Sequence, residues 1–101
     1  MINITITKSS ITAEGHADYA EYGKDIICAA VSTLAQSFIA SIEELTETEV
    51  EYKLEPGHIH IKHKDLDEAG ELLKRSFYIA VNMISKQYGD YVHLRVDADG
   101  R

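Results

Sequence analysis

The chain has 101 residues and a mass of 11.3 kDa, which is the size of one compact domain. Hydrophobic residues make up 45% and charged residues 27%, a composition typical of a folded globular protein. The 17 acidic against 10 basic side chains give a net charge of −7, which argues against direct binding of a nucleic-acid backbone and favours a basic protein or peptide as partner. We therefore expect a single domain over residues 1–101.

Neither a membrane span nor a signal peptide is expected. The longest unbroken apolar stretch, Ile26 to Val31, is far shorter than the roughly 20 residues of a span, and the first residues lack the charged and apolar regions of a signal peptide. The predicted location is the cytoplasm. The one cysteine, Cys28, excludes a disulfide within the chain and any CxxC redox or multi-thiolate zinc site.

The first 16 residues are predicted to form a β-hairpin. Isoleucine occupies every second position from Ile2 to Ile6, the period of a half-buried strand. A polar turn over residues 8–10 leads to a weaker strand, with Ile11 and Ala13, that runs towards Gly15 and His16.

A long helix is predicted from Asp25 to about Leu45. Asp25 is a good N-cap residue, so Cys28 is expected at the third helical position. Apolar residues recur every three or four positions and form one stripe. These residues are Ile27, Val31, Leu34, Phe38, Ile42 and Leu45.

A second hairpin, a second helix and a last strand follow. Residues 50–54 and 59–61 alternate between apolar and polar around Pro56-Gly57, a pair typical of a type II turn. The second helix is predicted to open at Asp65, with Glu68 three residues later, and to stop at Gly89. Its stripe comprises Leu66, Ala69, Leu73, Phe77, Ala80, Ile84 and Tyr88. Residues 91–96 alternate again, and residues 97–101 are expected to be a frayed tail.

The predicted order is ββαββαβ, an α+β fold in which a five-stranded mixed or antiparallel sheet packs with two long helices in a two-layer sandwich. The sequence leaves open whether both helices cover one face of the sheet.

The chemistry is expected between Gly15 and Ser32. A thiol in the first turn of a capped helix faces the positive end of the helix dipole, which favours the nucleophilic thiolate of Cys28. His16, at the end of a strand, is placed to act as general base. Cys28 lies roughly 70° from the centre of the apolar stripe, and Ser32 shares that flank. The N–H groups of residues 23–27 are candidate oxyanion donors.

Simpler interpretations of the same residues stay open. A lone cysteine among apolar neighbours is most often a small buried hydrophobe, and Asp25 serves as a plain N-cap more often than as a catalytic acid. Tyr19 and Tyr22 suit either loop packing or substrate contact. The glycines of this loop, Gly15 and Gly23, suit special backbone angles or hinges.

The other histidines suggest an alternative, a metal site. His58 and His60 lie on one face of a strand, but His63 has the opposite parity and no third ligand follows at a fixed spacing. A solvated sheet face explains them better, as it does His93 beside Arg95. The acidic run from Glu43 to Glu51 is most simply a solvated helix end and loop. No metal or cofactor is therefore predicted.

The ordered combination Gly15-His16-Ala17, Tyr22-Gly23-Lys24-Asp25-Ile26 and Cys28-Ala29-Ala30-Val31-Ser32 resembles the signature of the ribosomal-processing cysteine protease Prp (YsxB-like) family. The ββαββαβ order and the Ile-His-Ile strand of the second hairpin are also similar to that family. Ile27, where valine is common, is a conservative difference.

The resemblance implies a cysteine endopeptidase with a Cys-His dyad, in which Cys28 is the nucleophile and His16 its partner. Asp25 and Ser32 match positions near the active site. The family substrate is the precursor of large-subunit ribosomal protein twenty-seven, which is cleaved after an aromatic pair in its N-terminal extension during ribosome assembly. Family members are homodimers.

In the family, the loop that corresponds to residues 17–24 gates substrate entry. The loop residues singled out here are Gly15, Ala17, Tyr19, Tyr22 and Gly23. The alternative function is a non-enzymatic, ribosome-associated adaptor that binds a basic protein tail through the acidic surface.

Overall fold

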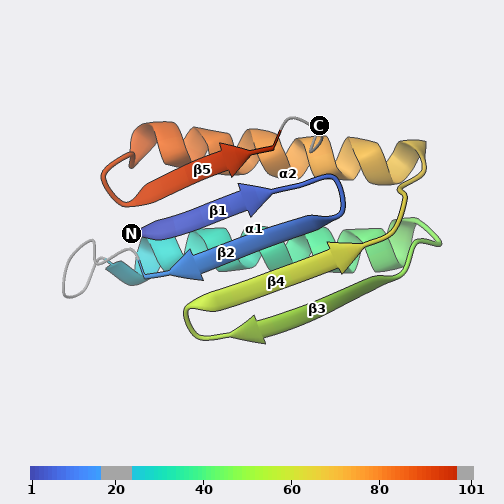
Figure 1. Ribbon diagram of the computed structural model, residues 1–101, viewed down its shortest axis with the longest axis horizontal. Coiled ribbons are helices and arrows are strands. Elements are labelled where there is room, and N and C mark those ends of the chain that lie inside the picture. Colours follow the sequence, from blue (N-terminus) through green and yellow to red (C-terminus); the bar gives the residue numbers. More distant parts are fainter. Residues whose placement is uncertain (17–23, 98–101) are drawn as a thin grey trace.

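The computed structural model of the chain describes residues 1–16 and 24–97, with the backbone alone at residues 24 and 25. Its elements follow the predicted order ββαββαβ (Figure 1). They are β1 (Ile2–Ile6), β2 (Ser10–Gly15), α1 (Lys24–Leu45), β3 (Val50–Glu55), β4 (His58–His63), α2 (Glu68–Gln87) and β5 (Val92–Val96).

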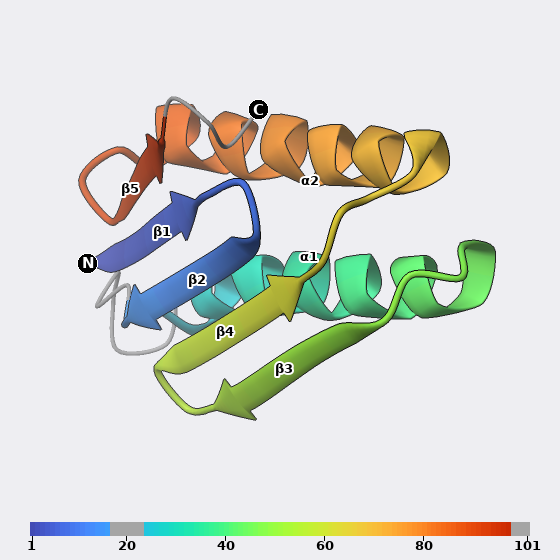
Figure 2. The same ribbon diagram turned by 45° about the vertical axis from the view of Figure 1, so that its right-hand side comes forward.

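The five strands form one mixed sheet in the order β3-β4-β2-β1-β5. Neighbours are antiparallel except β1 and β5, which run parallel. Both helices lie on the same face of this sheet, the point that the sequence left open (Figures 1 and 2). The expected two-layer α+β sandwich is confirmed, and the second face of the sheet carries polar side chains such as Thr12 and His60, joined by a 2.9 Å hydrogen bond.

The core lies between the helices and the sheet. The strand register aligns Ile4 with Ala13 and Leu94, and Ile6 with Ile11 and Val96, in apolar rows across the sheet. On the helix side, the rings of Phe38 and Phe77 join α1 to α2 with centroids 5.8 Å apart. One cluster of buried residues therefore holds all the layers together.

The helix α1 buries more of its surface than the predicted stripe. Ala35 and Ile39 are also buried, whereas Leu45 is 67% exposed because the helix runs past the core there. The segment 26–45 of this helix is, by length and composition only, long and apolar enough to cross a membrane, with a mean hydropathy of 1.6 over an 18-residue window. The longest unbroken apolar run, Ile26 to Val31, does not reveal this, because Ser32 and Thr33 interrupt it. In the fold the apolar face of α1 instead packs into the protein core.

The start of α2 differs from the prediction. Asp67, not Asp65, is the N-cap, and its carboxylate accepts a 2.8 Å hydrogen bond from the N–H of Gly70. The physical reason is that Leu66 is partly buried against the core, so the chain remains outside the helix through that residue. The helix ends at Gln87 with Tyr88 as C-cap, just before the predicted stop at Gly89.

The last strand begins at Val92, one residue later than predicted, and its end is tied to β1. The N–H of Asp97 donates to the carbonyl of Ile6 at 3.0 Å, and its carboxylate lies 3.3 Å from the guanidinium of Arg95. The remainder of the predicted tail, residues 98–101, lies outside the described residues.

A buried polar group joins β4, α2 and the β1–β2 turn. His63 is 4% and Lys74 6% exposed. The Lys74 ammonium donates to the carbonyls of Thr7 (2.7 Å) and Lys8 (3.3 Å) and lies 2.9 Å from His63 Nε2. His63 Nδ1 lies 2.7 Å from the carbonyl of Lys64, which can only accept, so Nδ1 carries the proton and Nε2 accepts from Lys74. The histidine is therefore neutral in this arrangement.

Burial lowers the pKa of His63 below its usual 6.5, and the Lys74 charge lowers it further, against the raising effects of the Lys64 carbonyl and of Glu71 and Asp65. We predict that the free energy of unfolding falls as the pH drops below about 6.5, because the unfolded chain then binds a proton that the folded chain resists. Urea denaturation between pH 5 and 8 measures it.

The matched variants are His63→Gln and His93→Gln, the second at an exposed site on β5. The first is expected to flatten the loss of stability at acid pH, and the second to leave it unchanged. Equal pH profiles for wild type and His63→Gln contradict the assignment.

Candidate active site

A cavity of about 480 Å³ opens where β2 ends and α1 begins. Three parts of the chain meet there: the β1–β2 hairpin, the first turns of α1 and the turn between β3 and β4. Its lining residues are Ile2, Ala13, Gly15, His16, Cys28, Ala29, Val31, Ser32, Leu54, Glu55, Pro56, Gly57, His58 and Ile59. The predicted His16 and Cys28 are thus brought together in one site.

His16 is held through its backbone at the end of β2. Gly15 has φ +102°, a conformation that favours glycine, and a Cβ there would collide with the carbonyl oxygen of Met1. The N–H of Gly15 donates to the carbonyl of Gly57 at 2.9 Å, and the backbone nitrogen of Met1 donates to the carbonyl of His16. Of the two interpretations left open for Gly15, a special backbone angle or a hinge, the structure shows the special backbone angle, which directs the chain into the site.

The imidazole of His16 packs against Gly57, in the turn between β3 and β4. Gly57 has φ +73°, as predicted for the Pro-Gly turn, and a Cβ there would lie 2.7 Å from His16 Nε2. Glycine is therefore required at position 57 for two reasons: the turn needs a positive φ, and the His16 ring needs the space that a Cβ would fill. The antiparallel pairing of Glu14 with His58 carries this turn to the end of β2.

Cys28 lies on the flank of α1 that the helical geometry predicted. It is half-buried and packs against the core cluster. The helix begins at Lys24, however, so Asp25 is in its first turn and is not the N-cap, and Cys28 is the fifth helical residue instead of the third. Because helix side chains lean towards the N-terminus, the thiol still lies over the first turn.

The first turn of α1 supplies backbone donors. The opening N–H groups of a helix have no acceptor within the helix, and in α1 these include residues 24–26. Among the predicted oxyanion donors of residues 23–27, these are the helix-terminal ones within the described residues. Ser32, one turn after Cys28, also lines the cavity, and its hydroxyl accepts a 2.9 Å hydrogen bond from the amide of Gln36.

Several predicted residues are not placed. Ala17, Tyr19, Tyr22 and Gly23 lie outside the described residues, as does the side chain of Asp25. In return, the structure adds Leu54, Pro56 and Gly57 to the site, which sequence reasoning treated as part of a hairpin. Their one signal was the Pro-Gly turn, and nothing local indicated that this turn meets His16.

The histidines of the alternative metal site have protein partners on the open face of the sheet. His60 Nδ1 lies 2.9 Å from the hydroxyl of Thr12, and His58 Nδ1 lies 3.9 Å from the carboxylate of Glu14. Within residues 1–16 and 24–97, no three His, Cys, Asp or Glu side chains are grouped so as to hold a metal ion.

A thiol and an imidazole at one cavity, with helix-terminal N–H groups in the turn before the thiol, are the parts that thiol-dependent acyl transfer needs. The family model described as cysteine protease Prp matches residues 1–93. The chain belongs to this family. It is accordingly a cysteine endopeptidase, and the signature found in the sequence is confirmed as that of Prp.

Relatives in two bacterial groups carry the same name. The ribosomal processing cysteine protease Prp of Staphylococcus aureus is 31% identical over 104 residues, which covers 93% of this chain and 97% of that protein. The Prp of Mycoplasma genitalium is 43% identical over 57 residues, 56% of this chain and 58% of that protein.

Solved structures show the same architecture. S. aureus Prp in complex with a covalently linked product peptide superposes with a TM-score of 0.87 at 26% identity, covering 96% of this chain and all of that one. A Streptococcus mutans protein superposes with a TM-score of 0.84 at 28% identity, covering 95% and 93% of the two chains. The α+β fold of this chain is thus that of the Prp proteases.

We predict that Gly57→Ala disables the peptidase. The added Cβ meets the His16 ring at a positive φ, so the variant is expected to lose about 1–2 kcal/mol of stability and, through the displaced imidazole, about a hundred-fold in kcat/KM. Peptide-cleavage kinetics and urea denaturation measure the two effects.

Gly89→Ala is the control, because a Cβ there has 3.4 Å of room to the Ser85 carbonyl. It should keep wild-type kinetics. Full activity in Gly57→Ala contradicts the role given to the turn.

Proposed function

We propose that this Prp protease removes the N-terminal extension of the precursor of large-subunit ribosomal protein twenty-seven in the cytoplasm, cutting after an aromatic pair. The observation that carries the proposal is that His16 and Cys28 line one cavity in a chain of the Prp family. The S. aureus relatives with substrate and product peptides support a peptide as substrate. A net charge of −7 suits a basic ribosomal protein.

The mechanism uses a Cys28–His16 dyad. The imidazole takes the thiol proton as the sulfur attacks the carbonyl carbon of the second aromatic residue. The N–H groups of the first turn of α1 stabilise the oxyanion. The C–N bond then breaks and the imidazolium protonates the leaving amine. Water, deprotonated by His16, hydrolyses the thioester and restores the thiol.

Two residues support the dyad in this proposal. Ser32 lies one turn from Cys28 and lines the cavity, and its hydroxyl accepts a hydrogen bond from the amide of Gln36. Asp25 lies in the first turn of the same helix, where a carboxylate is favoured by the helix dipole. The family membership favours this enzyme over the alternative of a non-enzymatic adaptor.

Cleavage of the extended precursor by wild type, Cys28→Ala and His16→Ala tests the proposal. We expect one cut after the aromatic pair, a loss of at least about a thousand-fold without the thiol, and a loss of about 10²–10⁴-fold without the imidazole. Product mass and rate are the measurements.

Iodoacetamide alkylation of Cys28 at neutral pH is the companion readout, expected to slow in His16→Ala. Undiminished cleavage by Cys28→Ala refutes the thiol mechanism. Equal alkylation rates in wild type and His16→Ala refute the dyad.

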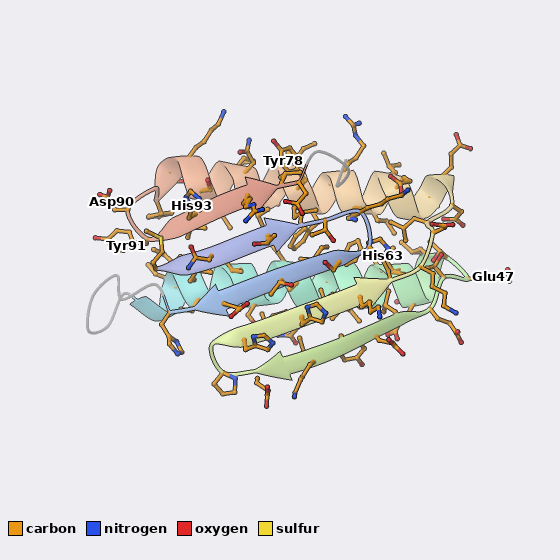
Figure 3. All side chains as sticks on the ribbon, viewed as in Figure 1. Glu47, His63, Tyr78, Asp90, Tyr91 and His93 are labelled. Carbon is orange, nitrogen blue, oxygen red and sulfur yellow. The ribbon has the colours of Figure 1, made fainter. Side chains whose placement is uncertain are left out.

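We also propose that the enzyme is a homodimer that pairs through α2. Leu72, Ile79 and Met83 share one helix face, at i, i+7 and i+11, and are 69%, 55% and 66% exposed. Tyr78, 38% exposed, lies instead on the flank of α2 that faces the end of β5, where it lines a hollow with Ile6 and Val96 (Figure 3). Exposed apolar residues gathered on one face mark an interaction surface.

Multi-angle light scattering tests the dimer. Ile79→Glu is expected to give a folded monomer by circular dichroism, because a carboxylate opposes burial in the interface. Leu45→Glu, at a similarly exposed leucine on α1, should leave the mass of the wild type unchanged. A wild-type protein that runs as a monomer overturns the proposal.

A further inference from the structure

The edge strand β3 exposes an apolar row. By register, Tyr52 pairs with Ile61 and Leu54 with Ile59, so these side chains lie on the helix side of the sheet, where burial is expected. Ile61 is buried, yet Tyr52 is 51% and Leu54 42% exposed. The strand lies at the rim of the sheet, beyond the cover that α1 gives to the inner strands (Figure 2).

The outer backbone edge of β3 is open to pairing. Among the described residues, β3 pairs with β4 alone. Native proteins blunt such edges with proline, inward-pointing charges or a covering segment, because an open edge is a template for another strand. Here Pro56 follows the strand and Lys53 points to the opposite face of the sheet, so neither protects the row formed by Tyr52 and Leu54.

One end of this row enters the active site. Leu54 and its partner Ile59 line the cavity that holds His16 and Cys28. The row is therefore continuous with the site at which the peptide bond is cut. A substrate chain that leaves the cavity in an extended conformation on this side would run along the open edge of β3.

The other end of the row meets an acidic surface. A hollow of about 520 Å³ lies between the end of α1 and the start of β3. It is lined by Glu43, Thr46, Glu47, Thr48, Glu49, Val50 and Glu51, with no basic residue among them. All its glutamates are exposed. Glu47 projects at the end of the molecule opposite the β3–β4 turn, as Figure 3 shows.

We infer that β3 binds the substrate polypeptide C-terminal to the cleaved bond as an added antiparallel strand. This rests on the proposed function. The apolar side chains of the substrate pack on Leu54 and Tyr52, and its basic side chains reach the glutamates of the acidic hollow. The direction follows from β3, which runs from the hollow to the cavity, and from the substrate, whose basic body follows the short extension that is removed.

The length of β3 sets the spacing. Six residues of strand span about 20 Å, so lysine or arginine is recognised about five to seven residues after the cleaved bond. Backbone pairing supplies binding that is independent of side chains, and the two apolar contacts and the acidic hollow supply the preference. The acidic run from Glu43 to Glu51, interpreted from the sequence as a solvated helix end and loop, thus extends the specificity of the site beyond the aromatic pair.

The test uses three peptides with the same cleavage sequence: one that ends three residues after the bond, one with two lysines six and seven residues after it, and one with two glutamates there. Dissociation constants are measured by fluorescence anisotropy on Cys28→Ala protein, and kcat/KM on the protein with its thiol. The lysine peptide is expected to bind about 3–10-fold tighter than the glutamate peptide, from two partly screened ion pairs.

Glu49→Lys is expected to reduce this preference to about two-fold or less, because the hollow then holds three carboxylates and one ammonium in place of four carboxylates. Asp90→Lys changes the net charge equally, from −7 to −5, but lies in the turn before β5, and it should keep the wild-type preference (Figure 3). If both variants lose the preference for the lysine peptide equally, the preference comes only from long-range attraction to the net charge of the protein, and the docking on β3 is overturned.

Backbone N-methylation of the lysine peptide separates strand addition from charge alone. Methyl groups at alternate residues after the bond should weaken binding at one parity and be tolerated at the other, because only every second N–H of an added strand faces β3. Equal effects at both parities overturn the strand geometry. If the shortest peptide is cut by wild type and not by Cys28→Ala while all three bind alike, the protease proposal stands and the β3 inference falls.

Discussion

The pairing of β2 with β4 is the constraint on which the site depends. It joins the N-terminal hairpin to the second hairpin, two units separated in the chain by α1, and its register sets Glu14 opposite His58. One residue beyond that pair, the N–H of Gly15 binds the carbonyl of Gly57, and Gly57 in turn leaves room for the ring of His16. A register slip of one residue would turn the apolar rows of the sheet away from the helices, so burial of the core also holds the imidazole in place.

The two ends of the sheet differ in structure: one is open at a cavity and the other is closed by a buried polar group. At one end, glycines at positive φ let two strands, a turn and a helix N-terminus converge on an open cavity. At the opposite end, Lys74 and His63 close the structure with hydrogen bonds to the carbonyls of Thr7 and Lys64. A buried ammonium is tolerated there because its donors are satisfied by three acceptors. The loss of stability that we predict at acid pH therefore arises at the end of the sheet opposite Cys28 (Figure 1).

The helices also cover the strands of the sheet unequally. Two helices protect the inner strands, whereas β3 keeps an exposed Tyr52 and Leu54 beside the active site. An enzyme that binds an extended peptide has a use for such an edge, since a strand with unpaired backbone groups supplies affinity without a deep pocket. The exposed apolar face of α2 is a second such surface, on a different element, so the proposed substrate strand and the proposed partner subunit do not compete for one surface.

The sequence by itself determined the element order, the apolar rows of Ile2, Ile4 and Ile6, the Pro-Gly turn, and the segment that holds His16 and Cys28. These are local matters of hydrophobic period, turn chemistry and motif. It placed the start of α2 less well, because Asp65 and Asp67 are equally good caps as residue types. The burial of Leu66 is what selects Asp67. Only the tertiary structure decided that both helices share one face, that Gly57 contacts His16, that Lys74 is buried and that Tyr52 is exposed. Each of these depends on which strands become neighbours and how far a helix reaches over them, and no local pattern contains that information.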